Sequence, residues 1–285
     1  MENQASLKNI QTEQVPDFAY SKIILSELRQ YLAVTECSPI SIKIVLRGEE
    51  RYRVENHNYR LSNNSYIIVN QGDQVETAVN SKETVNGLCI FPPIDLVNDV
   101  FSSYSIKSRR DPFDASVNDS FFTTHLRNLN QTNLGKYLNA NLRSIIGNKE
   151  DSFDFLEFYI GIAEAMSVDQ LGVEKMMAQL SATKRHTKEE LFRRMMTVKD
   201  YIHDNQNNRL DLKQLSELSH LSKYHFLRSF KKIFRKSPYQ YLLSLKIQKA
   251  EVLLKKGYSY NEITEMVGFS DVKNLRKAVG QRDRA

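Results

Sequence analysis

One pattern occurs twice in the last third of this chain, and it constrains the fold more than any other sequence feature. The first copy runs from Leu212 to Lys232 and the second from Ile263 to Val279, and equivalent positions such as Ser222 and Ser270 lie 48 residues apart. In each copy a short stretch with helically spaced apolar residues ends in a tight turn. A Leu-Ser or Phe-Ser pair then opens a second stretch that is rich in basic residues. The sequence therefore predicts two helix–turn–helix units.

The spacing of the two units and the distribution of charge both point to DNA. Two units at this separation can place two helices in successive major grooves on one face of a duplex. The chain has a formal net charge of +6, but residues 185–285 contain 22 Lys and Arg against 11 Asp and Glu, a net of +11. Residues 1–184 contain 18 against 23, a net of −5. A cationic third on an acidic remainder is typical of a nucleic-acid-binding module joined to another domain. A merely solvated basic surface is the alternative.

Cysteine usage and hydropathy give expectations about compartment and cofactors. The two cysteines, Cys37 and Cys89, are too few and too far apart for a disulfide framework or a zinc site. The first residues lack the basic and apolar segments of a signal peptide. No apolar run approaches the roughly 18 residues that span a bilayer. We therefore expect a cytoplasmic protein with no membrane association, no metal and no cofactor.

Residues 41–91 alternate between short apolar stretches and turn residues. Stretches such as 41–46 and 65–69 are bounded by Arg47-Gly48-Glu49 and by Asn70-Gln71-Gly72-Asp73. Short strands that recur about every ten residues predict an antiparallel sandwich or small barrel.

The period becomes helical between residues 120 and 180. One apolar stripe at helical spacing comprises Phe155, Phe158, Tyr159, Ile162, Ala163 and Met166. The stripe is expected either to pack on the barrel or to form a subunit interface, and the two can coexist. Residues 181–186 are polar and aperiodic, which predicts a linker.

The barrel does not carry the residues that a barrel enzyme needs. A metal-dependent enzyme requires a cluster of His and carboxylate side chains that point inward. The barrel has one histidine, His57, which is expected in a surface turn. Glu49, Glu50 and Glu55 are expected at turns or strand ends, and no nucleophile–base pair is evident. We therefore predict a sensor or assembly domain without catalytic activity.

The last hundred residues carry clear signals for helix boundaries. Expected N-caps and capping boxes are Thr187 with Glu190, Asp211, Ser222, and Ser259 with Glu262. Ser237-Pro238 should open a long helix that stops at Gly257. Gly268 is expected in the turn of the second unit, with a positive φ.

The second helix of the first unit has one apolar face. Phe226, Phe230 and Ile233 recur at i, i+4 and i+7, so they are expected in the core. The residues left on its outer face are Lys223, Tyr224, Leu227, Arg228 and Lys231.

These residues resemble the AraC/XylS family of bacterial transcription regulators. The matching pattern is Leu-x-x-Leu, Leu-Ser-x-x-x-Phe-x-Arg-x-Phe-Lys-Lys, Ser-Pro-x-x-Tyr, a basic residue and alanine before Leu-Leu, and Val-Gly-Phe-Ser, across residues 187–280. The upstream segment from Leu46 to Gly72 is similar to the cupin-like sensor domain that many such regulators carry. The resemblance implies a seven-helix bundle with two recognition helices, usually presented by a dimer.

By position, the resemblance places base-reading residues in both recognition helices. They are Tyr224, Leu227 and Arg228 in the first helix, and Val272, Lys273, Asn274 and Lys277 in the second. Arg228 can pair with guanine O6 and N7, Asn274 with adenine N6 and N7, and Lys277 with a guanine or a phosphate. Phosphate contacts are expected from Ser222, Lys231 and Lys232, and Lys223 is a further DNA-binding candidate. For each residue, a merely solvated side chain is the alternative.

Three departures from the family pattern affect these expectations. Arg235 stands where the family usually has glycine before Ser-Pro, so that turn is expected to be strained. Leu275 and Val279 replace the usual aromatic pair. The sequence stops at Ala285, whereas the family continues with a Gly-x-Ser-Pro segment and a last helix. We therefore expect a frayed second unit and a dominant first unit.

The whole sequence predicts an α+β protein. Residues 1–180 are expected to form a small antiparallel β-barrel, a cupin-like jelly roll, with a helical dimerisation segment. Residues 181–187 are the expected linker, and residues 188–285 the all-α bundle with two helix-turn-helix motifs. The expected function is regulation of transcription by a homodimer on promoter or operator DNA. A small-molecule effector and RNA polymerase are possible partners.

Two other functions remain open at this point. One is a cupin-type barrel enzyme with an appended helical domain. The other is an interaction protein that forms mixed dimers and whose DNA-binding domain is inactive.

Overall fold

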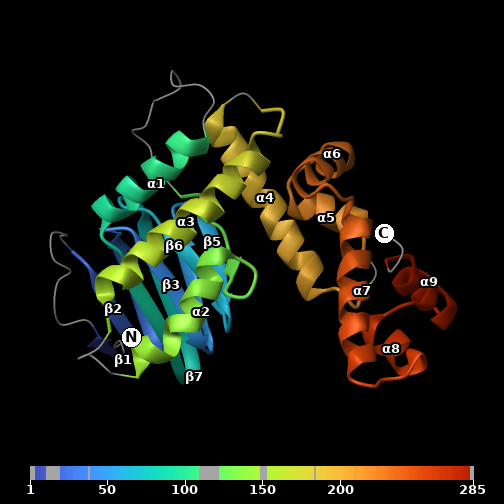
Figure 1. Ribbon diagram of the computed structural model, residues 1–285, viewed down its shortest axis with the longest axis horizontal. Coiled ribbons are helices and arrows are strands. Elements are labelled where there is room, and N and C mark those ends of the chain that lie inside the picture. The colour runs from blue at the N-terminus through green and yellow to red at the C-terminus, as the bar shows by residue number, and fades with distance from the viewer. Residues whose placement is uncertain are drawn as a thin grey trace. The chain divides into compact units, whose positions relative to one another are not determined.

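The computed structural model describes residues 4–10, 20–37, 39–108, 122–147, 153–182, 184–208 and 210–282. The chain divides into two compact units, which we call unit 1 (Met1–Glu174) and unit 2 (Lys175–Ala285). Unit 1 combines antiparallel strands with helices, and unit 2 is helical (Figure 1). The predicted α+β class is therefore confirmed.

Unit 1 is built on eight described strands. They are β1 (Gln4–Asn9), β2 (Lys22–Glu36), β3 (Ser41–Arg47), β4 (Glu49–Val54), β5 (His57–Ser62), β6 (Ser65–Val69), β7 (Gln74–Phe91) and β8 (Arg127–Asn128). Its helices are α1 (Ile94–Ser108), α2 (Asn133–Ile146) and α3 (Phe155–Met177), the last of which continues into unit 2. The last part of the region in which short strands were expected, residues 41–91, is one long strand, β7, and β1 and β2 lie before that region.

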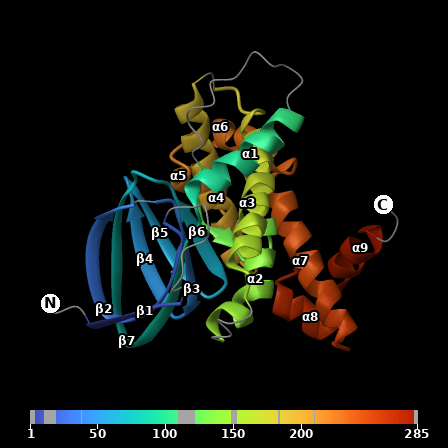
Figure 2. The same cartoon turned by 60° about the vertical axis from the view of Figure 1, so that its left-hand side comes forward.

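A long ribbon of β2 and β7 organises the antiparallel sheet. The two strands pair from Lys22 with Phe91 to Glu36 with Gln74, interrupted by one register shift after Leu28. The second half of β7 pairs with β3, which continues through β6 to β8, whereas the first half pairs with β4 and through it with β5. One ribbon thus belongs to two layers of strands (Figure 2). This arrangement confirms the expected antiparallel sandwich or small barrel.

Side chains of alternate residues enter two different cores. On β3, Ile42 and Ile44 face the helices, while Lys43 and Val45 face the interior between the two layers of strands. The interior cluster draws buried residues from β2 and from β3 to β7, including Val45, Leu61 and Val75. The period-two alternation of each strand produces this division.

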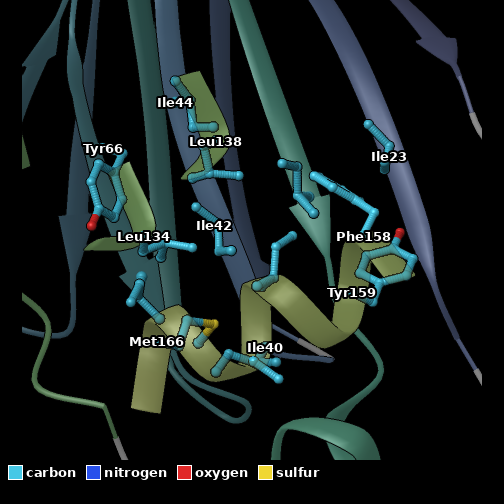
Figure 3. Packing of buried hydrophobic residues seen from close by; sticks show 14 of the residues in the cluster. Ile23, Ile40, Ile42, Ile44, Tyr66, Leu134, Leu138, Phe158, Tyr159 and Met166 are labelled. Atoms are coloured by element: carbon cyan, nitrogen blue, oxygen red, sulfur yellow. The ribbon is translucent and has the colours of Figure 1, made fainter. Parts of the chain in front are cut away.

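The apolar stripe of α3 packs on the sheet. Phe158, Tyr159, Ile162, Ala163 and Met166 are all buried against the cluster that contains the β3 isoleucines (Figure 3). The packing interpretation of the stripe is therefore confirmed. The opposite face of α3 leaves a few large apolar side chains exposed, namely Leu156, Ile160 and Val168.

Two side chains of unit 1 are not where the sequence analysis placed them. Glu50 is buried on the inner face of β4 and is 1% exposed, although it was expected at a strand end facing solvent. His57 begins strand β5 and is half-buried, with the turn at Glu55 and Asn56 before it. Both errors have one cause: β4 and β5 form a tight hairpin that starts immediately after Gly48, so the strands reach closer to the turns than expected.

Unit 2 contains six described helices after α3. They are α4 (Arg185–Asp204), α5 (Leu212–Leu218), α6 (Lys223–Phe234), α7 (Pro238–Lys255), α8 (Tyr260–Val267) and α9 (Val272–Arg282). Of the expected linker, residues 185–187 belong to α4, and residue 183 lies outside the described part of the chain.

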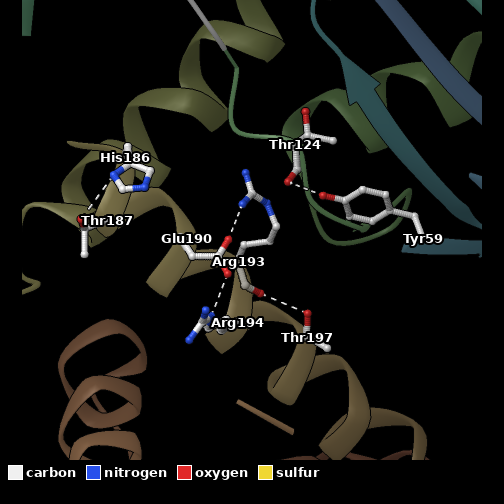
Figure 4. A network of polar contacts seen from close by, with 8 residues as sticks. All are labelled: Tyr59, Thr124, His186, Thr187, Glu190, Arg193, Arg194 and Thr197. Carbon is white, nitrogen blue, oxygen red and sulfur yellow. Dashed lines mark hydrogen bonds and ion pairs between the residues drawn. The ribbon is translucent and has the colours of Figure 1, made fainter. Parts of the chain in front are cut away.

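The expected capping box at the start of α4 does not form. The N-cap is Lys184, which makes no side-chain capping bond, and Thr187 lies inside the helix. Glu190 instead accepts from Arg193 Nη1 and from Arg194 Nε, both at 2.7 Å (Figure 4). The prediction was wrong because a carboxylate bonds more strongly to guanidinium groups three and four residues along the helix than to a neutral backbone N–H.

Candidate nucleic-acid interface

The first helix–turn–helix consists of α5 and α6, and its caps are those expected. Asp211 accepts from the Lys213 N–H at 2.8 Å, and Ser222 accepts from the His225 N–H at 3.4 Å. His220 adopts a left-handed φ of 51° in the turn between them. The N-cap serine fixes where α6 begins, and it therefore fixes which side chains face outward.

The inner face of α6 is an aromatic cluster. Phe226, Phe230 and Ile233 are buried as expected. The Phe230 ring centroid lies 5.7 Å from that of Phe226, 4.5 Å from that of Phe234 and 6.0 Å from that of Tyr241 on α7. Such edge and tilted contacts hold the helix in one orientation.

The outer face of α6 carries the residues expected to touch DNA. Ser222, Lys223, Tyr224, Arg228 and Lys231 are exposed, and Leu227 is half-buried. Lys232 is also half-buried, and its ammonium group donates to Ser181 Oγ within unit 2. The fold thus brings the first set of candidates onto one face, with Lys232 turned toward Ser181.

The turn after α6 is strained as the sequence predicts. Arg235 is the C-cap and has a left-handed φ of 58°. An L-residue with a side chain pays a steric penalty there that glycine does not. Ser237 then caps α7 in a complete capping box with Gln240, and Pro238 follows at the first helical position.

Arg235→Gly should stabilise unit 2 by about 1 kcal/mol, because it relieves the Cβ clash of the left-handed conformation. Urea unfolding of the full chain measures the change. Lys236→Gly is the matched control. Lys236 is the next residue along the chain and is exposed, and it is not among the residues with positive φ. A control variant that gained as much stability would contradict the explanation by strain.

The second helix–turn–helix consists of α8 and α9. Ser259 and Glu262 form the expected capping box, and hydrogen bonds from Ser259 lower the pKa of Glu262. Gly268 ends α8 with φ 73°, as expected. A Cβ at Gly268 would lie 2.4 Å from the Asn207 carbonyl oxygen, so glycine is needed both for the turn and for this close approach.

The recognition helix of the second unit, α9, has a formed core and an exposed polar face. Leu275 and Val279 are buried in a cluster with residues of α7 and α8. Lys273, Asn274 and Lys277 are exposed, and Val272 is half-buried. The two aliphatic residues therefore fill the place of the aromatic pair that the resemblance led us to expect.

Asn274 already has partners in the structure. Its side-chain Nδ2 donates to Asp271 Oδ2 at 2.7 Å and to Ser270 Oγ at 3.0 Å. Its backbone N–H donates to Asp271 Oδ1 at 2.7 Å. Asp271 is therefore the residue that caps α9, a role that the sequence analysis did not assign. Asn274 can bond to an adenine only after it exchanges these contacts.

Lys246 is a further residue that the sequence analysis did not single out. It lies on α7 and is buried, and its Nζ donates to the Gly268 carbonyl at 2.6 Å. The same ammonium lies 5.9 Å from the centroid of the Phe269 ring. Burial lowers its pKa. Lys246 thus fixes the turn of the second unit, and its signal in the sequence is a cation that takes a place in the buried stripe of α7, four residues after Leu242 and four before Ala250.

In the part of the chain that the structure describes, no group of three or more His, Cys, Asp or Glu side chains is arranged to hold a metal ion. Among the same residues, no helix is long and apolar enough to cross a membrane.

Comparison with known proteins agrees with the geometry of unit 2. Residues 215–282 match a family model described as a helix-turn-helix domain. A relative from Bacillus subtilis (strain 168), the uncharacterized HTH-type transcriptional regulator YbfI, is 34% identical over 78 residues. The match covers 27% of this chain and 28% of that protein, so the chain spans about a quarter of the relative's length.

Solved structures are similar at low identity. ToxT from Vibrio cholerae is 12% identical with a TM-score of 0.36, covering 98% of this chain and 94% of that one. The Cupin_2 domain of an XRE family regulator from Enterobacter cloacae is 11% identical with a TM-score of 0.28, covering 30% and 93%. The caps, the buried faces and the family match in residues 215–282 together identify this part of the chain as a helix-turn-helix domain.

Proposed function

We propose that this protein is a sequence-specific DNA-binding regulator of transcription, in which unit 2 binds promoter or operator DNA. The observation that carries the proposal is the pair of capped recognition helices, each with an apolar face in the core and an exposed face of basic and polar residues. They lie in a segment whose formal net charge is +11. A helix fixed by its cap and core presents its outer face reproducibly to a major groove.

Within this proposal the exposed residues have two kinds of role. Arg228 reads a guanine, and Lys277 reads a guanine or contacts a phosphate. Tyr224, Leu227, Val272, Lys273 and Asn274 complete the base-facing set. Ser222, Lys223, Lys231 and Lys232 lie near the backbone, where contacts position the protein without specifying sequence.

The remaining parts of the proposal concern unit 1 and assembly. Residues 1–180 act as a cupin-like sensor and dimerisation domain, residues 181–187, of which the last three begin α4, as the linker, and residues 188–285 as the DNA-binding domain. The division into compact units near residue 174 supports this organisation.

The exposed apolar side chains of α3 are a candidate contact in a homodimer. An effector would shift the balance between two arrangements of the domains. We assign no catalytic step to unit 1. Action on promoter DNA, with RNA polymerase as a possible partner, implies a cytoplasmic location.

Arg228→Ala should weaken binding to specific DNA by about 1–3 kcal/mol, the value of one bidentate guanine contact. On a scrambled duplex the loss should be smaller, because there the side chain contributes at most a charge. Gel-shift titrations of both duplexes at one salt concentration measure the difference. Equal losses on the two duplexes would show that Arg228 contacts only the backbone.

Lys277→Ala is the matched variant in the second recognition helix. It should lose less affinity than Arg228→Ala if the first unit dominates binding. A larger loss for Lys277→Ala would assign the main readout to α9. No sequence-dependent binding by the wild-type chain would favour the interaction-protein alternative.

A further inference from the structure

Three side chains at the start of α9 are joined by hydrogen bonds, and we call Ser270, Asp271 and Asn274 the α9 cap motif. The Asp271 carboxylate accepts three of these bonds. Its Oδ1 accepts from the Asn274 backbone N–H at 2.7 Å, and its Oδ2 accepts from Asn274 Nδ2 at 2.7 Å and from Ser270 Oγ at 3.1 Å. Asn274 Nδ2 also donates to Ser270 Oγ at 3.0 Å. The motif therefore holds the Asn274 side chain at two points.

The Asp271 carboxylate determines which end of the Asn274 amide faces the motif. A carboxylate has no proton to donate, so the Nδ2 end of the amide can bond to it and the Oδ1 end cannot. The amide has two N–H groups, and the motif supplies two acceptors for them. Among the residues that the structure describes, Oδ1 makes no hydrogen bond. Asn274 therefore has an acceptor to offer to a ligand, while its donors are engaged.

Asn274 lies in the part of a recognition helix that meets the bases. It belongs to the first turn of α9, and its side chain is exposed. The next residue, Leu275, is buried in the core of unit 2, which fixes the rotation of α9 about its axis. The N-terminal residues of a recognition helix contact base edges in the major groove. The end of the amide that the motif leaves unused therefore decides what Asn274 can read.

A bidentate contact with adenine is the competing arrangement. It requires Nδ2 of Asn274 to donate to adenine N7 while Oδ1 accepts from adenine N6. Nδ2 must then leave both Asp271 and Ser270. The exchange loses one charge-assisted and one neutral hydrogen bond and gains one neutral bond, and charge-assisted bonds are the stronger kind. A single contact through Oδ1 keeps the motif intact and is therefore favoured.

We propose that Asp271 sets the base specificity of α9 by holding Asn274 as a hydrogen-bond acceptor. In the major groove adenine N6 and cytosine N4 are donors, whereas guanine and thymine present only acceptors. At one position of one strand Asn274 therefore reads adenine and cytosine alike. It rejects guanine and thymine, whose oxygens would face its own oxygen unpaired. Asp271 is a positioning residue, because it acts through Asn274. The inference rests on the proposed function and names the bases that the second recognition helix reads.

The test is selection of bound duplexes from a randomised pool with the full chain, followed by sequencing. Asn274→Ala identifies the position that Asn274 reads: the preference there should disappear, while the positions read by α6 keep theirs. At that position the wild-type pool should contain adenine and cytosine at similar frequency. Duplexes with guanine or thymine there should bind about 5- to 150-fold more weakly, the cost of one wrong base.

Asp271→Ser connects this preference to the carboxylate. Serine also caps α6, at Ser222, so the variant keeps a good N-cap while the Asn274 amide becomes free to turn. The variant should select adenine alone through the bidentate contact. A duplex with 7-deazaadenine at that position, which lacks N7, should weaken binding by the variant and leave wild-type binding unchanged. Glu265→Ser, which removes an exposed carboxylate from α8, is the matched control and should keep the wild-type preference.

A purely structural role of Asp271 would weaken binding to every duplex without changing the preference at one position. The inference is wrong if the wild-type chain excludes cytosine there, prefers guanine or thymine, or binds 7-deazaadenine more weakly than adenine. It is also wrong if every preference survives in Asn274→Ala, or if folded Asp271→Ser selects as the wild type does. If Asp271→Ser does not fold, the wild-type response to 7-deazaadenine decides. A pool without any enriched position would instead overturn the proposed function itself.

Discussion

Affinity for DNA should fall about 10³-fold between 50 and 200 mM salt, and log affinity should fall linearly with log salt concentration. Six exposed cations on the two recognition helices would enter the counterion atmosphere of the duplex, whether each bonds to a base or to a phosphate: Lys223, Arg228, Lys231, Lys273, Arg276 and Lys277. Each neutralised phosphate releases condensed counterions, and six contacts give a slope of about −5. Fluorescence anisotropy of one labelled duplex across a salt series measures this slope.

Single variants show whether the cations of unit 2 are responsible. Lys231→Ala should reduce the slope by about one, because it removes one phosphate contact. Lys82→Ala, which removes an exposed cation from β7 of unit 1, should leave the slope unchanged. If affinity is flat across the salt series, the electrostatic basis of the proposed function is wrong.

Phe230→Ala should destabilise unit 2 by about 3–5 kcal/mol, the range for truncating a buried phenylalanine. The side chain is fully buried and contacts the rings of Phe226, Phe234 and Tyr241. Its removal leaves a cavity between α6 and α7, and both helices position the recognition face. Urea unfolding followed by circular dichroism measures the loss, and binding to DNA should weaken with it.

Tyr224→Ala is the matched control in the same helix. Tyr224 is 67% exposed, so its truncation should change stability by no more than about 0.5 kcal/mol. Tyr224→Ala should still weaken specific DNA binding if its ring faces the bases. A loss of stability as large as that of Phe230→Ala would mean that the orientation of α6 is not as described.

Unit 2 could be predicted from the sequence in most of its parts because its signals are local. A serine or aspartate N-cap, a glycine in a turn and an apolar face at period 3.6 each act within a few residues. Ser222, Ser259, Gly268 and the buried face of α6 accordingly occupy their expected places. The capping box at Thr187 failed because nearby guanidinium groups competed for Glu190.

For unit 1, the sequence predicted the fold class but not which strands pair. β2 and β7 pair residues that are far apart in sequence, and short apolar stretches do not reveal which strands continue through a polar segment. Glu50 was misplaced because β4 begins directly after Gly48, so that the residue lies inside the strand and faces the interior of the sandwich. Lys246 was missed because its acceptor is the carbonyl of Gly268, 22 residues away in the turn after α8.

The ribbon of β2 and β7 also determines how fast each half of the chain can fold. Lys22 must find Phe91 before the layer that contains β3 is complete, whereas the helices of unit 2 mainly contact their neighbours in sequence. Distant pairings require long loops to close first, which slows folding. A denatured chain returned to native conditions therefore regains its cationic helical unit before its sandwich. For that interval the protein is a basic helical bundle attached to an open strand edge, the state most prone to aggregate.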